Sequence, residues 1–135
     1  MTATVADLPV TADECLARYI FQKNKRDVRP DGTIKPDPFI PFKYVELSVT
    51  RHRGLNESQI WSIGDMVAEK VGSKLHGRAD RLTAVFVSQN LQVVAAPEDG
   101  NPNHANVIGW PLEKQAQKEI ALEVAKGAKF TARIS

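Results

Sequence analysis

The sequence predicts an α+β fold in which a mainly antiparallel sheet of about five strands packs under two helices. Apolar and polar residues alternate over 44–50, which is typical of a strand with one buried face. A helix-start signal at Asn56 precedes apolar residues at helical spacing. Runs of strands precede each helix, with no regular strand-helix-strand rhythm and no internal repeat of roughly 20 to 50 residues. A parallel α/β sheet is the alternative arrangement.

Length and composition fit one globular domain. The chain has 135 residues, of which 42% are hydrophobic and 25% are charged, so collagen-like and fully disordered classes are excluded. Residues 1–13 show no periodicity and are interpreted as a flexible N-terminal lead. Residues 14–135 then form the single α+β domain.

The first half of the domain contains one clear strand and one clear helix. Residues 18–22 fit a strand or the end of a short helix, and residues 23–38 form a turn-rich loop because proline, aspartate and glycine cluster there. The alternating strand at 44–50 follows. Residues 57–71 are predicted as a helix because Asn56 and Gln59 have the spacing of a capping box, and Gly72 follows as the stop.

The second half adds three strands and a helix. Residues 82–87 are apolar on both faces, as in a central strand, and residues 91–96 are expected to pair with them as a hairpin. After a polar loop at 97–103, residues 104–110 return to a strand pattern. The second helix is expected to begin at Pro111, with apolar residues every fourth position along one face.

The single cysteine, Cys15, excludes an intramolecular disulfide and a zinc site built on several thiolates, which favours a reducing cytoplasm. The chain begins without a basic and apolar signal, and no segment approaches the roughly 20 apolar residues of a membrane helix, so we expect a soluble protein that does not enter a membrane. Glu14 adjoins Cys15, and its negative charge disfavours a thiolate. Cys15 is therefore interpreted as a small apolar group.

The charges are sorted along the chain although the net charge is only +2. Residues 18–53 contain nine basic and four acidic residues and residues 70–81 four basic and one acidic, whereas residues 82–125 contain two basic and five acidic residues. If the first two blocks meet, they form one basic face that binds an anion. The candidate anion-binding residues are Arg51, Arg53, Arg78, Arg81 and Asn106. The alternative is a solvated surface without a partner.

All three histidines lie at predicted strand ends or loops beside arginine or asparagine. If they converge, His104 and either His52 or His76 serve as base and acid, Arg51 or Arg78 stabilises charge, and Asn106 orients a phosphate ester, with no metal or other cofactor. Otherwise these residues bond to loop carbonyls and cap the sheet. A three-histidine zinc site is not favoured because the histidine spacing matches no local ligand pattern, and signatures of NTPases, dinucleotide enzymes and serine hydrolases are missing.

The string His104-Ala105-Asn106-Val107-Ile108-Gly109-Trp110-Pro111 resembles one in small uncharacterised bacterial proteins. The resemblance extends over roughly residues 18–128 and includes Ile60-Trp61 and His76-Gly77-Arg78-Ala79. It implies a bacterial, intracellular, single-domain protein and carries no catalytic role.

Three functions remain open. The leading hypothesis is an intracellular binding or accessory protein whose basic face takes RNA, DNA or a nucleotide. The second is a small metal-independent enzyme that acts on a phosphate ester through the histidines. The third is a subunit that docks on a protein partner or on a second copy through a helix edge around Trp61 and Met66, although Trp61 and Trp110 also fit core positions.

Overall fold

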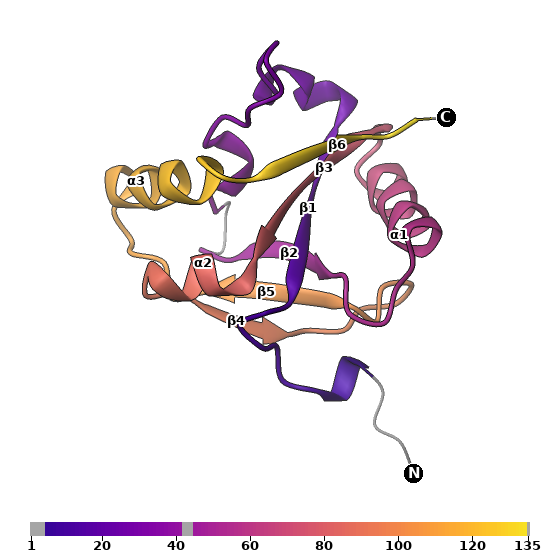
Figure 1. The fold of residues 1–135 in the computed structure, drawn as a ribbon, viewed down its shortest axis with the longest axis horizontal. Helices are drawn as coiled ribbons and strands as arrows, with labels where there is room; N and C mark the ends of the chain where they lie inside the picture. Colours follow the sequence, from indigo (N-terminus) through magenta and orange to yellow (C-terminus); the bar gives the residue numbers. More distant parts are fainter. Residues whose placement is uncertain (1–4, 42–44, 135) are drawn as a thin grey trace.

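The computed structural model describes residues 5–41 and 45–134, so residues 1–4 of the predicted lead and Tyr44 of the predicted strand lie outside the described residues. One antiparallel sheet with the strand order β4-β5-β2-β1-β3-β6 forms the centre (Figure 1). Its strands are β1 (Cys15–Phe21), β2 (Leu47–Arg51), β3 (Leu75–Leu82), β4 (Gln92–Ala95), β5 (His104–Ile108) and β6 (Lys129–Ala132). The predicted α+β class is confirmed, with six strands in place of about five.

Helices cover both faces of the sheet, with α1 on one face and α2 and α3 on the other (Figure 1). The α-helices are α1 (Glu57–Lys70), α2 (Thr83–Ser88) and α3 (Lys114–Ala125), and the 3₁₀ helices are η1 (Val5–Asp7), η2 (Gln22–Asp27) and η3 (Asp37–Phe39). None of the helices in the described ranges is long and apolar enough to cross a bilayer.

Each face of the sheet has its own apolar cluster because side chains alternate along the strands. Leu16 and Ile20 of β1 point into the larger cluster, where Phe86 of α2 and Val124 of α3 are buried. Ala17 and Tyr19 point the other way and pack against α1. β1 therefore lies between both layers and forms the middle of the molecule.

The predicted helix at 57–71 is confirmed as α1, including its capping box. The Asn56 side chain accepts from the Gln59 amide at 2.9 Å, and the Gln59 side chain accepts from the Asn56 amide at 2.9 Å. The predicted strand at 44–50 begins later, at Leu47, because Val45 adopts a left-handed φ of 56° that interrupts the extended chain.

The predicted central strand at 82–87 is wrong, because Thr83–Ser88 form the helix α2. The Thr83 amide and hydroxyl both donate to the Glu14 carbonyl, at 2.9 and 3.0 Å, which turns the chain out of the sheet. Thr83 and Phe86 are then buried on one helical face, three residues apart. The expected hairpin is also wrong, since β4 pairs with β5.

β3 occupies a position inside the sheet, as was expected of residues 82–87. It was not predicted as a strand because it contains several charged residues. The second predicted helix begins at Lys114 rather than at Pro111 because Glu113 is still extended. After α3 the chain forms β6, an edge strand that was not predicted.

Candidate functional site

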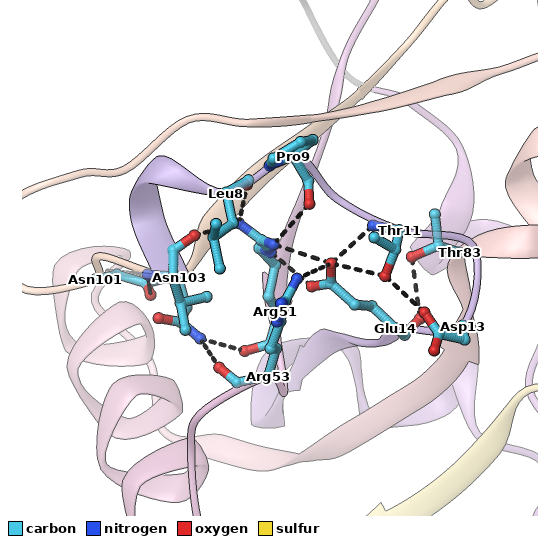
Figure 2. A network of polar contacts seen from close by, with 11 residues as sticks. Leu8, Pro9, Thr11, Asp13, Glu14, Arg51, Arg53, Thr83, Asn101 and Asn103 are labelled. Atoms are coloured by element: carbon cyan, nitrogen blue, oxygen red, sulfur yellow. Dashed lines mark hydrogen bonds and ion pairs between the residues drawn. The ribbon is translucent and has the colours of Figure 1, made fainter. Parts of the chain in front are cut away.

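The site is built on a buried ion pair between the start of β1 and the end of β2. Arg51 is 0% exposed, and its guanidinium donates to both carboxylate oxygens of Glu14, from Nε at 2.7 Å and from an Nη at 2.9 Å (Figure 2). Its remaining contacts are with the carbonyls of Val5, Leu8 and Pro9. Arg51 therefore joins the N-terminal segment to the sheet and is not free to bind a partner.

Glu14 is ionised because its partners outweigh its burial. Burial alone raises the pKa of this carboxyl, whereas the hydrogen bonds from Arg51 and Thr11 lower it below its ordinary value. Thr11 contributes its amide at 2.7 Å. The negative charge of Glu14 is thus balanced locally by Arg51.

The residues that follow this pair in each strand, Cys15 and His52, are brought together by the same pairing. Leu16 is the register partner of Arg51, and the His52 amide donates to the Cys15 carbonyl at 3.0 Å. Asp80 of β3 lies beside them because its register partner is Ala17, two residues after Cys15 in β1. The Cys15 sulfur, one His52 ring nitrogen and one Asp80 oxygen all lie within 4.8 Å of one another. We call these three residues the thiol cluster.

His52 is protonated at neutral pH. Its Nε2 lies 3.0 Å from Asp80 Oδ1, with the two side chains 20% and 12% exposed. Burial by itself lowers the pKa of His52, but the interactions with Asp80 and with the Cys15 thiol outweigh it and raise the pKa to about 9. An imidazolium therefore stands beside the thiol.

Asp80 is held in place by Arg78, which is in turn held by α1. Arg78 Nε lies 3.1 Å from both Asp80 oxygens, and its terminal nitrogens donate to Glu57 at 2.8 and 3.0 Å. The guanidinium carbon lies 4.5 Å from the centre of the Trp61 ring. Burial lowers the pKa of Arg78, but Glu57 and Asp80 outweigh it and raise the pKa. Charges of alternating sign thus run from Glu57 to His52.

Two pockets have Cys15 and His52 in their lining. The first, of about 510 Å³, is also lined by Thr11, Asp13, Glu14 and Arg53. The second, of about 540 Å³, is also lined by Glu57, Arg78, Asp80, Arg81, Leu82, Gly127, Lys129 and Thr131. The thiol can therefore be approached by a small molecule that reaches into both pockets.

The thiol cluster offers sulfur, nitrogen and oxygen donors of the kinds that zinc takes. Its hydrogen bonding does not favour a metal, because both Asp80 oxygens already accept from Arg78 and His52 carries a proton that a metal must displace. In the described ranges no other group of three such side chains converges, so the three histidines do not form a metal site there.

The other two histidines lie elsewhere. His76 Nδ1 is 3.3 Å from the side-chain nitrogen Nε2 of Gln22, and the ring stacks on Phe130 at 5.4 Å between centres. His104 Nδ1 donates to the Ala96 carbonyl at 2.7 Å, and its Nε2 is 3.7 Å from Glu98. His104 lines a separate cavity of about 120 Å³. The structure therefore does not assemble these histidines with His52.

The remaining candidate residues divide between the two pockets and the rest of the sheet. Arg53 lines the first pocket, is 41% exposed at its side chain and lies 3.6 Å from Glu14. Arg81 lines the second pocket and donates from Nε to the Val124 carbonyl at 2.9 Å. Asn106 is on β5, opposite Ser48 and Val94, and lines neither pocket.

The two tryptophans have structural partners. Trp110 is buried and donates from Nε1 to the Val107 carbonyl at 3.0 Å. Trp61 is half-buried beneath Arg78, and Arg133 also lies over its ring, at 5.4 Å.

Two residues of the site were not predicted from the sequence: Cys15, which was interpreted as a small apolar group, and Glu57. The useful signal is the spacing of Arg78 and Asp80, since residues two apart on a strand share a face. Comparisons with protein-family models, with curated proteins and with solved structures gave no match.

Proposed function

We propose that this protein is a thiol-dependent acyl-transfer enzyme in which Cys15 is the nucleophile and His52 the general acid and base. The observation that supports this proposal is the thiol cluster, where thiol, imidazole and carboxylate lie within 4.8 Å of one another at the junction of two pockets. A nucleophile beside a base that a third group orients is the arrangement that covalent catalysis requires.

The reaction begins from a thiolate beside an imidazolium. The Cys15 thiolate attacks the carbonyl carbon of the substrate, and the leaving group departs with the proton of His52, which leaves an acyl thioester on the sulfur. Neutral His52 then takes a proton from a water molecule, and the water oxygen attacks the thioester. The acid is released, and the thiolate and the imidazolium are restored.

Asp80 and Arg78 act as positioning residues in this proposal. Asp80 holds the His52 ring and stabilises its positive form, and the Arg78 guanidinium fixes the orientation of the Asp80 carboxylate. Arg78 is itself braced by Glu57 and Trp61 of α1. Contacts of Arg78 with α1 therefore help to hold the acid-base pair in position.

Alkylation by iodoacetamide tests the proposal directly because Cys15 is the only cysteine. At pH 7 we expect the folded protein to react about tenfold faster than the same chain in urea, since only the fold places the His52 imidazolium beside the sulfur. His52→Gln is expected to remove most of this difference, and Asp80→Asn a smaller part. His76→Gln, whose ring lines neither pocket, is the matched control.

Circular dichroism spectra establish that each variant is folded before its rate is compared. The proposal fails if folded wild type reacts no faster than the chain in urea, or if His52→Gln reacts as fast as wild type. Because iodoacetamide is uncharged, its rate measures activation of the Cys15 thiol and not attraction of the reagent to charges in the pockets.

A second candidate function is binding of a polyanion such as RNA, DNA or a nucleotide. It is favoured by three exposed cations on η2, namely Lys23, Lys25 and Arg26, for which the described residues provide no ion pair. Because η2 has no buried residue, these side chains serve no packing role.

A further inference from the structure

We infer that the second pocket binds an anionic group of the substrate, a carboxylate or phosphate, next to the reactive thiol. The inference rests on the proposed thiol chemistry and specifies the class of small molecule on which it acts. We call the cations concerned, Arg81 and Lys129, the anion subsite.

The two acidic residues of this pocket are already neutralised by internal partners. Glu57 accepts from both terminal nitrogens of Arg78, and Asp80 accepts from Arg78 and His52. Arg81 and Lys129 have no acidic partner among residues 5–41 and 45–134. Arg81 and Lys129 are therefore two cations that no carboxylate of the pocket neutralises, and such cations attract an anion.

The backbone around α3 orients the Arg81 guanidinium. Its Nε donates to the Val124 carbonyl near the end of α3, which leaves the two terminal nitrogens without a protein acceptor in the described ranges. Gly127 leaves room for this group, because a Cβ there would approach Arg81 atoms to 2.6 to 2.9 Å. A guanidinium held in this way offers two parallel donors to a carboxylate or phosphate.

Lys129 reaches the same pocket from the edge strand β6. It is the register partner of Asp80, and Thr131 is the register partner of Arg78. Register partners point to the same face, so Lys129 and Thr131 lie on the face that holds Asp80. Thr131 adds a hydroxyl to the pocket lining.

Two alkylating reagents of similar size and different charge test the anion subsite. We expect the ratio of the iodoacetate rate to the iodoacetamide rate to be about threefold higher for the folded protein than for the same chain in urea. Arg81→Gln and Lys129→Gln are each expected to lower this ratio toward the value in urea. Gly127→Ala, which displaces the guanidinium, is expected to act like Arg81→Gln.

Lys118→Gln is the matched control, since Lys118 is an exposed lysine of α3 that lines neither pocket. A ratio equal to that in urea, or one that Lys118→Gln lowers as much as Lys129→Gln does, would overturn the inference. The proposed function fails separately, through an iodoacetamide rate that is not raised.

Competition identifies the anion. Slower iodoacetate labelling in the presence of acetate supports a carboxylate substrate, and slower labelling with inorganic phosphate supports a phosphate-bearing one. Protection by a single-stranded oligonucleotide at concentrations where neither small anion protects would overturn the small-molecule assignment and favour a polyanion. No protection by any of the three would also contradict the subsite.

Discussion

At the scale of single residues, Arg51 determines how the N-terminal segment meets the sheet. A guanidinium that is 0% exposed can remain charged only where acceptors surround it, and Glu14 with three carbonyls supplies them. The same residue lies next to His52, so the pair that anchors the segment also fixes the backbone under the thiol cluster.

We expect loss of Arg51 and loss of Glu14 to lower the free energy of unfolding by different amounts. Arg51→Met leaves the Glu14 carboxylate buried without its cation and should lower the free energy of unfolding by about 3 to 5 kcal/mol. Glu14→Gln should cost less because the three carbonyls still accept from Arg51. Urea unfolding at pH 7 measures both. Arg53→Met, which removes an exposed neighbour of Glu14, is the control and should change little.

The pH dependence of this difference provides a check. The pKa of Glu14 is lower in the folded protein than its ordinary value of 4.5, so its stabilising contribution is complete above pH 4.5 and is lost as pH falls through the folded value. The gap in stability between wild type and Glu14→Gln should therefore shrink on acidification. A gap that stays constant from pH 7 to pH 3 would contradict the ion pair.

The Cys15 site shows why local sequence could not predict the chemistry. Along the chain the nearest charge to Cys15 is Glu14, which argues against a thiolate. In the fold, the Glu14 carboxylate is occupied by Arg51 and Thr11, and the imidazolium of His52 arrives from 37 residues away in the sequence. Only the pairing of β1 with β2 and β3 brings these groups together, and that pairing is not encoded in any short motif.

At the scale of elements, the capping box of α1 was predictable because its signal lies within four consecutive residues. We expect Asn56→Ala to lower the free energy of unfolding by about 1 kcal/mol, since the Gln59 backbone amide loses its side-chain acceptor. Ser58→Ala, an exposed change in the same turn, should have little effect or stabilise slightly. Thermal unfolding compares the two, and equal shifts would exclude a capping role for Asn56.

Tertiary contacts explain why α2 and β3 were not predicted from the sequence. The apolar residues of Thr83–Ser88 fit a strand, but bonds to the Glu14 carbonyl turn the chain into α2. Conversely, β3 contains His76, Arg78, Asp80 and Arg81, and so many charged side chains are unusual in a central strand. They are accommodated because Glu57, Trp61 and the Val124 carbonyl from two helices provide partners.

In the whole molecule, the basic residues that cluster in two segments of the sequence are divided between buried and exposed positions. Arg51 and Arg78 are buried and bonded, so these two basic residues of the segments 18–53 and 70–81 stabilise the fold. The cations of η2 are exposed. They follow Phe21 at one end of β1, whereas Cys15 of the thiol cluster is at the other end of this strand. A polyanion bound there would leave the two pockets accessible.

Replacement of these η2 cations tests polyanion binding independently of the thiol. If short single-stranded RNA or DNA binds η2, the logarithm of the binding constant should fall with the logarithm of salt concentration, and the triple variant Lys23→Gln, Lys25→Gln, Arg26→Gln should reduce this slope by about 2. Fluorescence anisotropy of a labelled oligonucleotide measures the slope. The matched control changes three exposed lysines of α3 and its C-cap, Lys114, Lys118 and Lys126, to Gln, with the same loss of charge. An equal reduction by both triple variants would indicate attraction to net charge alone, whereas a reduction confined to the η2 variant locates the polyanion site on η2.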